Sequence, residues 1–283
     1  MHLGFSSMNT PIDPAPTTLA PMLEQAGFES LWYGEHSHIP RCRRTAYPGG
    51  GELPEPYKAM MDPYVSLMAA AGVTDSLKLG TGIALLMERE LFSQAKTIVT
   101  LERLTHGRLM IGTGVGWNEE EFENASAHPF KKRYAVMRET VAATRALMTQ
   151  DTPEFHGEYI DFDSVWFEPK PSCVPQITFG AMGPLGIHHA AQWADGWMPV
   201  DMAMPDIPLA ITDFKRQVQA FGRNPDDVEI TLVVMNPVTE DLLYRYRDYG
   251  ITRCNVGIRA DQWNKPEMIE PLINQCAKII PNL

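Results

Sequence analysis

Short segments of β-strand character alternate with helical segments along the whole chain, and this alternation constrains the fold most strongly. Eight segments are rich in apolar residues, and most of them end in Gly, Ser or Asn: 2–7, 30–35, 77–85, 108–115, 176–181, 196–200, 229–235 and 253–258. Their apolar character is nearly continuous, which is typical of parallel strands that are buried on both faces.

Helical patterns fill the intervals between these segments. Residues 17–26 begin with two threonines, which we expect to cap a helix, and stop at Gly27, a residue that favours a helix end. Further helices are predicted over 62–75, 92–106, 131–148, 185–194, 206–221, 238–249 and 266–280. Strand and helix repeated eight times predict an α/β fold, a (β/α)8 TIM barrel, as a single domain over residues 1–283. A doubly wound sheet is the alternative, but the first turn, GFSSMNTP, has one glycine where a dinucleotide-binding motif needs three.

Two segments are longer than ordinary connections in such a barrel. Residues 37–61 follow the second strand, and residues 151–175, which have the pattern of a β-hairpin, precede the fifth. Long loops in compact domains are often lids or binding loops. We therefore expect residues 37–61 to close over a site at the end of the second strand.

Charge and cysteine usage limit the class of partner. The chain has 24 Lys and Arg against 35 Asp and Glu, a net charge of −11, which disfavours nucleic acid and anionic membranes as partners. Its four cysteines form no CxxC pair, and no apolar run is long enough to span a membrane. These features predict a cytoplasmic protein with reduced thiols that acts on a small molecule.

Side chains at the C-terminal ends of barrel strands carry the chemistry of this fold. The pair His36 and His38 has the HxH spacing of some metal hydrolases, but the later strand ends add no further ligand except Asp201, slightly beyond its strand. We therefore predict no metal site.

Glycine-rich sequences follow three of the predicted strands: GTGI at 80–83, GTGVGWN at 112–118 and GAMGP at 180–184. Glycine there either lets the backbone approach a flat ligand or relieves crowding at the barrel rim. The third stretch opens a helix, and the free N–H groups of a helix start favour a phosphate. Together they indicate a planar cofactor that bears a phosphate.

Over nearly its whole length the sequence resembles the bacterial luciferase-like flavin and deazaflavin oxidoreductases. The matching stretches are GFESLWYGEHSHIP, LKLGTGIALL, LERLTHGR, LMIGTGVGWNEEEFE and GPLGIHHAAQWADGW. Within that family, EHSHIPRCRRTAYPGGGELP together with GWNEEEFEN is most similar to the branch that uses coenzyme F420, a 5-deazaflavin with a phosphate, a lactyl group and a polyglutamate tail. The resemblance implies an F420-dependent oxidoreductase that transfers a hydride to or from a small organic substrate. It also implies a homodimer formed through helices 62–75 and 92–106. An FMN-dependent luciferase-like monooxygenase and a non-catalytic flavin-binding protein are the alternatives.

The resemblance also implies which residues bind the cofactor. A non-prolyl cis peptide is expected between Gly82 and Ile83, behind the central ring, and Asn118 is expected to hydrogen-bond the ring system. The expected phosphate seat is Gly180, Ala181, Met182 and Gly183, and Ser6 is added because it ends the first strand. Val115 stands where the sugar-phosphate dehydrogenase branch has a proton-donating glutamate, which disfavours that activity.

His36 is the candidate proton donor, because histidine exchanges its proton nearest to neutral pH. Glu35 is expected either to hold His36 or to bond the cofactor, although a purely structural histidine is an alternative. Arg43 and Arg44 are expected to hold an anion, either the polyglutamate tail or a substrate carboxylate, or instead to pair with local acids. Trp117 is either a wall of the pocket or core.

Overall fold

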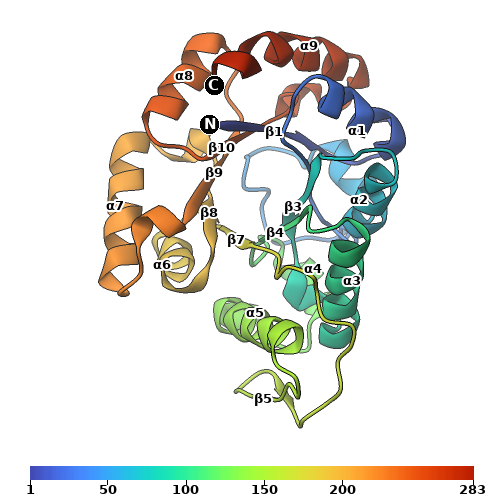
Figure 1. Cartoon of the computed structure of the whole chain (residues 1–283), viewed down its shortest axis with the longest axis vertical. Helices are drawn as coiled ribbons and strands as arrows, with labels where there is room; N and C mark the ends of the chain where they lie inside the picture. The colour runs from blue at the N-terminus through green and yellow to red at the C-terminus, as the bar shows by residue number, and fades with distance from the viewer.

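The computed structural model of the chain describes all 283 residues, and eight parallel strands form a closed barrel inside a ring of helices (Figure 1). The strands are β1 (His2–Ser7), β2 (Ser30–Tyr33), β3 (Lys78–Ala84), β4 (Leu109–Thr113), β7 (Ile177–Gly180), β8 (Gly196–Met198), β9 (Glu229–Val234) and β10 (Arg253–Val256). Neighbours around the barrel follow the order β1-β10-β9-β8-β7-β4-β3-β2. The predicted TIM barrel is confirmed, and each predicted strand segment contains one of these strands.

Helices connect successive strands on the outside of the barrel (Figure 1). They are α1 (Pro16–Gln25), α2 (Pro63–Ala71), α3 (Leu91–Leu104), α5 (Arg133–Thr149), α6 (Pro184–Trp193), α7 (Ile207–Ala220), α8 (Glu240–Asp248) and α9 (Ile269–Ile279). A short helix that the sequence did not predict, α4 (Glu119–Ala125), follows β4. The predicted threonine caps of α1 are wrong, because Ala15 is the N-cap and Pro16 opens the helix with its preset φ.

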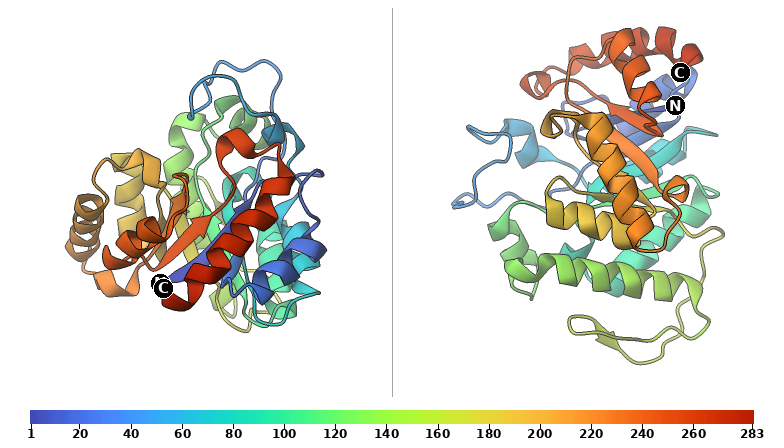
Figure 2. Two further views of the ribbon diagram at one scale, coloured as in Figure 1. Left: turned by 90° about the horizontal axis from the view of Figure 1, so that it is seen from above. Right: turned by 90° about the vertical axis from the view of Figure 1, so that its left-hand side faces the viewer.

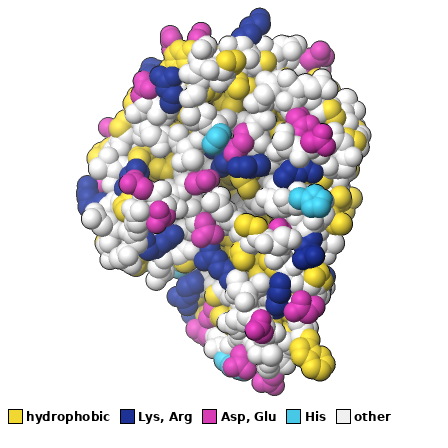
Figure 3. Space-filling model, viewed as in Figure 1, with side chains coloured by type: hydrophobic (Ala, Val, Ile, Leu, Met, Phe, Trp, Pro, Cys, Tyr) yellow, Lys and Arg dark blue, Asp and Glu magenta, His cyan; other side chains and the backbone are white.

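An ion-paired arginine lies inside the barrel near the N-terminal ends of the strands. The guanidinium of Arg253 is 2% exposed, and it donates to both carboxylate oxygens of Glu29 at 2.5 and 2.8 Å and to Glu229 at 3.1 Å. Burial raises the pKa of Glu29, but the hydrogen bonds and charge of Arg253 outweigh burial and lower it to about 2. On the face seen in Figure 3, acidic and basic side chains are interspersed.

The two long insertions lie in different places. Residues 37–61 stand above the barrel mouth, on the side opposite the two chain ends (Figure 2, left). The hairpin β5 (Phe155–His156) and β6 (Asp161–Phe162) lies outside α5, away from residues 37–61 (Figure 2, right). Glu139 of α5 ties the hairpin in place by accepting hydrogen bonds from the backbone of Glu158, Tyr159 and Ile160. No helix is long and apolar enough to cross a membrane.

Candidate active site at the C-terminal ends of the strands

A bulge at the end of β3 forms one wall of the barrel mouth. The peptide bond between Gly82 and Ile83 is cis, as the resemblance implied, and the pairing of β3 with β4 shifts register between Thr81 and Ala84. The carbonyl of Ile83 accepts a hydrogen bond from the backbone N–H of Glu35 at 3.0 Å. The bulge is therefore joined to the segment that follows β2, where the candidate histidine lies.

The side chain of Ile83 explains two of the glycines at the strand ends. A Cβ atom at Gly114 would lie 2.3 Å from Ile83 Cδ1, and one at Gly180 would lie 2.9 Å from Ile83 Cγ2. Both distances are below a van der Waals contact, so a side chain at either position would require Ile83 to move. Gly114 and Gly180 thus relieve crowding around Ile83, which is one of the two roles that the sequence left open.

Asn118 combines deep burial with a lack of hydrogen-bond partners. It is 2% exposed, and neither its side-chain oxygen nor its side-chain nitrogen has a partner in the protein. It occupies the N-cap position of α4 but does not cap the helix. Buried polar side chains nearly always have partners, so this amide fits a ligand that presents both a donor and an acceptor, such as the edge of a flavin or deazaflavin ring.

The expected phosphate seat lies at the start of α6. Gly183 is the N-cap of this helix and provides no side-chain cap, and a Cβ atom there would meet nothing within 4 Å. Ala181 is buried, and its carbonyl accepts from Trp197 Nε1 at 2.9 Å, whereas Met182 is half exposed. The uncapped N–H groups and the positive end of the helix dipole fit a phosphate. Ser6 is the last but one residue of β1, across the barrel from β7 and the start of α6, with its carbonyl against Gly257.

His36 is held by a glutamate that the sequence reasoning missed. Its Nδ1 lies 2.6 Å from Oε2 of Glu121 in α4, and the two side chains are 9% and 1% exposed. The imidazole is also flanked edge-on by the rings of Tyr57 and Trp117, with centroids 5.2 and 5.8 Å away. The sequence EEEF did not predict this contact, because three adjacent glutamates do not show which of them points into the protein.

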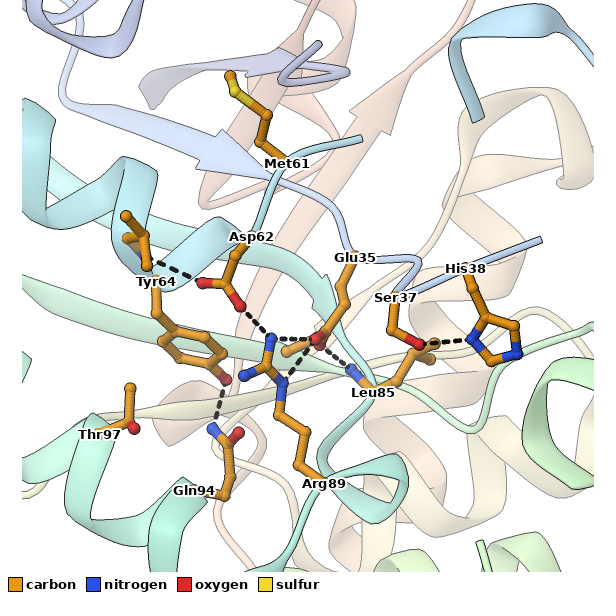
Figure 4. A network of polar contacts seen from close by, with 12 residues as sticks. Glu35, Ser37, His38, Met61, Asp62, Tyr64, Leu85, Arg89, Gln94 and Thr97 are labelled. Atoms are coloured by element: carbon orange, nitrogen blue, oxygen red, sulfur yellow. Dashed lines mark hydrogen bonds and ion pairs between the residues drawn. The ribbon is translucent and has the colours of Figure 1, made fainter. Parts of the chain in front are cut away.

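Glu35 has partners other than His36 (Figure 4). One carboxylate oxygen accepts from the backbone N–H of Leu85 at 2.8 Å, and the other accepts from Arg89 Nε at 2.6 Å. Arg89 also bonds Asp62 at 2.6 Å and lies over the ring of Tyr64. The expectation that Glu35 holds His36 is therefore wrong. Its carboxylate instead fixes the turn after β3 to the end of β2.

An aromatic cluster closes the barrel mouth. Tyr47 and Tyr57 from the 37–61 segment pack edge-on against Trp117, with ring centroids 5.9 and 6.4 Å away, and Tyr57 also meets Trp263 at 5.7 Å. Arg43 lies over the Trp117 ring at 5.7 Å, and its Nη1 atom is buried without a partner. Trp117 is thus a wall between the barrel mouth and the 37–61 segment, which is folded down over it.

Arg44 pairs with local acids, which is the second of its two predicted roles. Its guanidinium lies 3.4 Å from Glu120 and 3.3 Å from Glu123, both on α4, and its side chain is 74% exposed. The backbone N–H groups of Arg44 and Thr45 also donate to Glu120, at 2.5 and 3.3 Å. Arg43 and Arg44 therefore have different positions: Arg43 faces the barrel mouth, and Arg44 anchors the 37–61 segment to α4.

Glu88 is a carboxyl group that no cation balances. Burial, and then the negative charges of Glu121 and Glu35, raise its pKa to about 8. One of its oxygens is buried without a partner. At neutral pH Glu88 is therefore mostly protonated, whereas Glu35 is balanced by Arg89.

Asp201 and the histidines of α6 have structural partners. The carboxylate of Asp201 accepts hydrogen bonds from Met202, Met235, Asn236 and the hydroxyl of Tyr246, and it thereby joins β8 to the end of β9. His189 stacks on Tyr134. No group of three or more His, Cys, Asp or Glu side chains is arranged to hold a metal ion. All four cysteines are unpaired.

Known proteins share both the sequence pattern and this fold. The family described as luciferase-like monooxygenase matches residues 14–245. An uncharacterized protein of Mycobacterium tuberculosis strain H37Rv is 33% identical over 265 residues, which cover 91% of this chain and 92% of that protein. The 5,10-methylenetetrahydromethanopterin reductase of Methanolobus tindarius is 24% identical over 222 residues, which cover 78% of this chain and 61% of the reductase.

Solved structures extend the comparison at lower sequence identity. An F420-dependent secondary alcohol dehydrogenase, in complex with an F420–acetone adduct, has a TM-score of 0.75 at 18% identity and covers 99% of this chain and 98% of its own. A monooxygenase from Streptomyces bottropensis has a TM-score of 0.68 at 20% identity, over 100% of this chain and 80% of its own. These structures share the barrel fold. Since the family match spans most of the sequence, the chain belongs to the luciferase-like monooxygenase family.

Proposed function

We propose that the protein is an oxidoreductase that binds coenzyme F420 at the barrel mouth and exchanges a hydride with a small organic substrate. The observation that carries the proposal is Asn118, a buried amide whose donor and acceptor both lack partners beside the strand ends. One similar structure supports the deazaflavin over FMN, since the alcohol dehydrogenase is described as F420-dependent.

The chain's own residues have distinct tasks in this proposal. Asn118 and the Gly82–Ile83 bulge would hold the ring system, and the start of α6 would hold the phosphate. When bound, the deazaflavin supplies hydride exchange at a carbon of its central ring. His36 would hold or release the proton that accompanies the hydride at the substrate oxygen or carbon. The aromatic rings of the 37–61 segment would exclude water from the reacting atoms.

Binding titrations test this proposal directly. Purified protein is titrated separately with F420 and with FMN, and we expect saturable binding of F420. Asn118→Leu should weaken that binding by about tenfold or more, because a hydrogen-bonding pair to the ring is lost. Asn282→Leu, at an exposed position in the last turn of the chain, is the control and should leave binding unchanged. Tight FMN binding without F420 binding would instead support a flavin monooxygenase.

Turnover separates an enzyme from a binding protein. With F420 bound, a panel of alcohols, enones and imines should include a compound that exchanges a hydride, and His36→Ala should abolish that exchange. If F420 binds but no compound reacts, and His36→Ala changes affinity alone, the protein is a non-catalytic binding protein.

Arg43 is the arginine that we propose for an anionic group. It faces the mouth over Trp117, whereas Arg44 is already paired with Glu120 and Glu123. Arg43→Ala should therefore weaken F420 binding more for longer polyglutamate tails if it holds the tail. It should raise only the substrate constant if it holds a substrate carboxylate. Arg44→Ala, which keeps the backbone hydrogen bonds to Glu120, is the matched control and should change neither.

A homodimer through α2 and α3 remains part of the proposal. Val65 on α2 is 71% exposed, and Leu104 and Phe92 on α3 are 58% and 38% exposed. Exposed apolar side chains on neighbouring helices favour a symmetric contact between two copies. Light scattering at micromolar concentration should give the mass of a dimer, and Val65→Glu should shift it towards the monomer. A monomer mass for the unaltered protein would count against the dimer.

A further inference from the structure

The hydrogen bond of His36 fixes which of its two nitrogens is available. Glu121 contacts Nδ1, so Nε2 is the atom left to face other groups at the mouth. Glu121 comes from α4, is almost fully buried, and has its second oxygen, Oε1, buried without a partner. Its position is therefore specified by the fold and not by solvent.

Glu121 lies beside two other acidic side chains. Three carboxyl groups lie near each other here, since Glu35 and Glu121 both act on the ionisation of Glu88. Glu35 is balanced by Arg89, and Glu88 holds a proton at neutral pH. An ionised carboxylate only accepts hydrogen bonds, so the short contact requires the proton on Nδ1 of His36.

We propose that Glu121 is a positioning residue that keeps the proton of His36 on Nδ1 and presents Nε2 to the reacting atom of the substrate. This inference deepens the proposed function and rests on it for the role of Nε2. The tautomer itself does not depend on a bound cofactor. Hydrogen bonds from a carboxylate to the far nitrogen fix catalytic histidines in the same way in other active sites.

The same helix also holds the segment that covers the mouth. Glu120, the neighbour of Glu121, accepts from the backbone of Arg44 and Thr45, and Asn124 lies 3.0 Å from Nε2 of His38. One face of α4 therefore orients His36 while another anchors residues 37–61. Loss of Glu121 should leave those anchors in place, which makes a local test feasible.

Nitrogen-15 spectra of the imidazole rings test the tautomer in the protein without cofactor. Protein labelled at histidine is recorded at a pH where His36 is neutral, and His36→Gln identifies its signals among the eight histidines. We expect a protonated Nδ1 and an unprotonated Nε2 in the unaltered protein. Glu121→Leu should return the ring to a mixture of tautomers, whereas Glu123→Leu, on the exposed side of α4, should not.

The outcomes separate this inference from the proposed function. A protonated Nε2 in the unaltered protein, or identical spectra for Glu121→Leu and Glu123→Leu, would overturn the role of Glu121 whatever the enzyme does. If Glu121→Leu fails to fold, the spectrum of the unaltered protein still shows which nitrogen of His36 carries the proton. With F420 and a substrate, Glu121→Leu should reduce kcat by about 10²–10³-fold while F420 affinity stays within about twofold. Glu121→Gln, which retains an acceptor, should recover part of kcat.

Discussion

Glu88→Gln replaces a carboxyl group that titrates with an amide that does not. The amide has a similar size and still forms hydrogen bonds. The pKa of Glu88 is about 8 in the folded protein, against an ordinary value of 4.5, because burial and the charges of Glu121 and Glu35 disfavour its ionised form. Between these two pH values the folded state binds more protons than the unfolded state. The free energy of unfolding therefore falls as pH rises through this interval.

The size of the effect follows from the width of the interval. Each pH unit contributes about 1.4 kcal/mol, so the full interval sets an upper bound of about 5 kcal/mol. Water reaches part of this side chain, so we expect about 2–4 kcal/mol. Glu88→Gln does not ionise and should gain that much stability relative to the unaltered protein between pH 4.5 and pH 8, with little difference below pH 4.5.

Urea unfolding at a series of pH values measures this difference. The stability of Glu88→Gln minus that of the unaltered protein should rise steadily from pH 5 to pH 8, while titrations common to both proteins cancel. Glu267→Gln, an exposed carboxylate before α9, is the matched control and should give a flat difference. A flat difference for Glu88→Gln as well would refute the assignment of a protonated Glu88.

Three further results are expected. Asn118→Leu should stabilise the protein without cofactor by about 1–3 kcal/mol in thermal or urea unfolding, because a buried amide without partners is removed; destabilisation would contradict this. Tyr57→Ala should expose residues 37–61 to limited proteolysis, because it deletes ring contacts with His36, Tyr47, Trp117 and Trp263 worth about 0.5–1.5 kcal/mol each; an unchanged cleavage rate would show that the contacts with α4 hold the segment without these rings. Arg253→Ala should cost about 3–5 kcal/mol, because it removes a buried guanidinium that pairs with both Glu29 and Glu229 and leaves Glu29 with Lys78 alone; a loss below 1 kcal/mol in urea unfolding would contradict it.

The barrel was predictable because its signals are local. Each strand is a short apolar run bounded by turn residues, and each long helix repeats apolar positions at helical spacing. The short helix α4 was not predicted, because its seven residues include three adjacent glutamates and no apolar stripe. The first turn of α1 was misjudged because Pro16 opens the helix and makes a threonine cap unnecessary.

The candidate site was predictable in part, since strand ends are known once strands are known. His36, Gly82 and Asn118 were identified by this rule together with the family resemblance. The partner of His36 was not, because 85 residues separate it from Glu121 and only the barrel brings the ends of β2 and β4 together. Glu35 was predicted as a partner of His36 because the two residues are adjacent in the sequence. Successive side chains of an extended segment, however, point in opposite directions.

The crowding around Ile83 limits how relatives of this chain are able to diverge. Its side chain fills the space that a Cβ atom at Gly114 or Gly180 would need, so the three positions lie at the ends of three different strands but are expected to vary together. Alanine at Gly114 or Gly180 should be harmful in this background and tolerated once Ile83 is replaced by a smaller residue. The order in which substitutions are acquired then matters, because a smaller residue at position 83 makes room for alanine at Gly114 or Gly180.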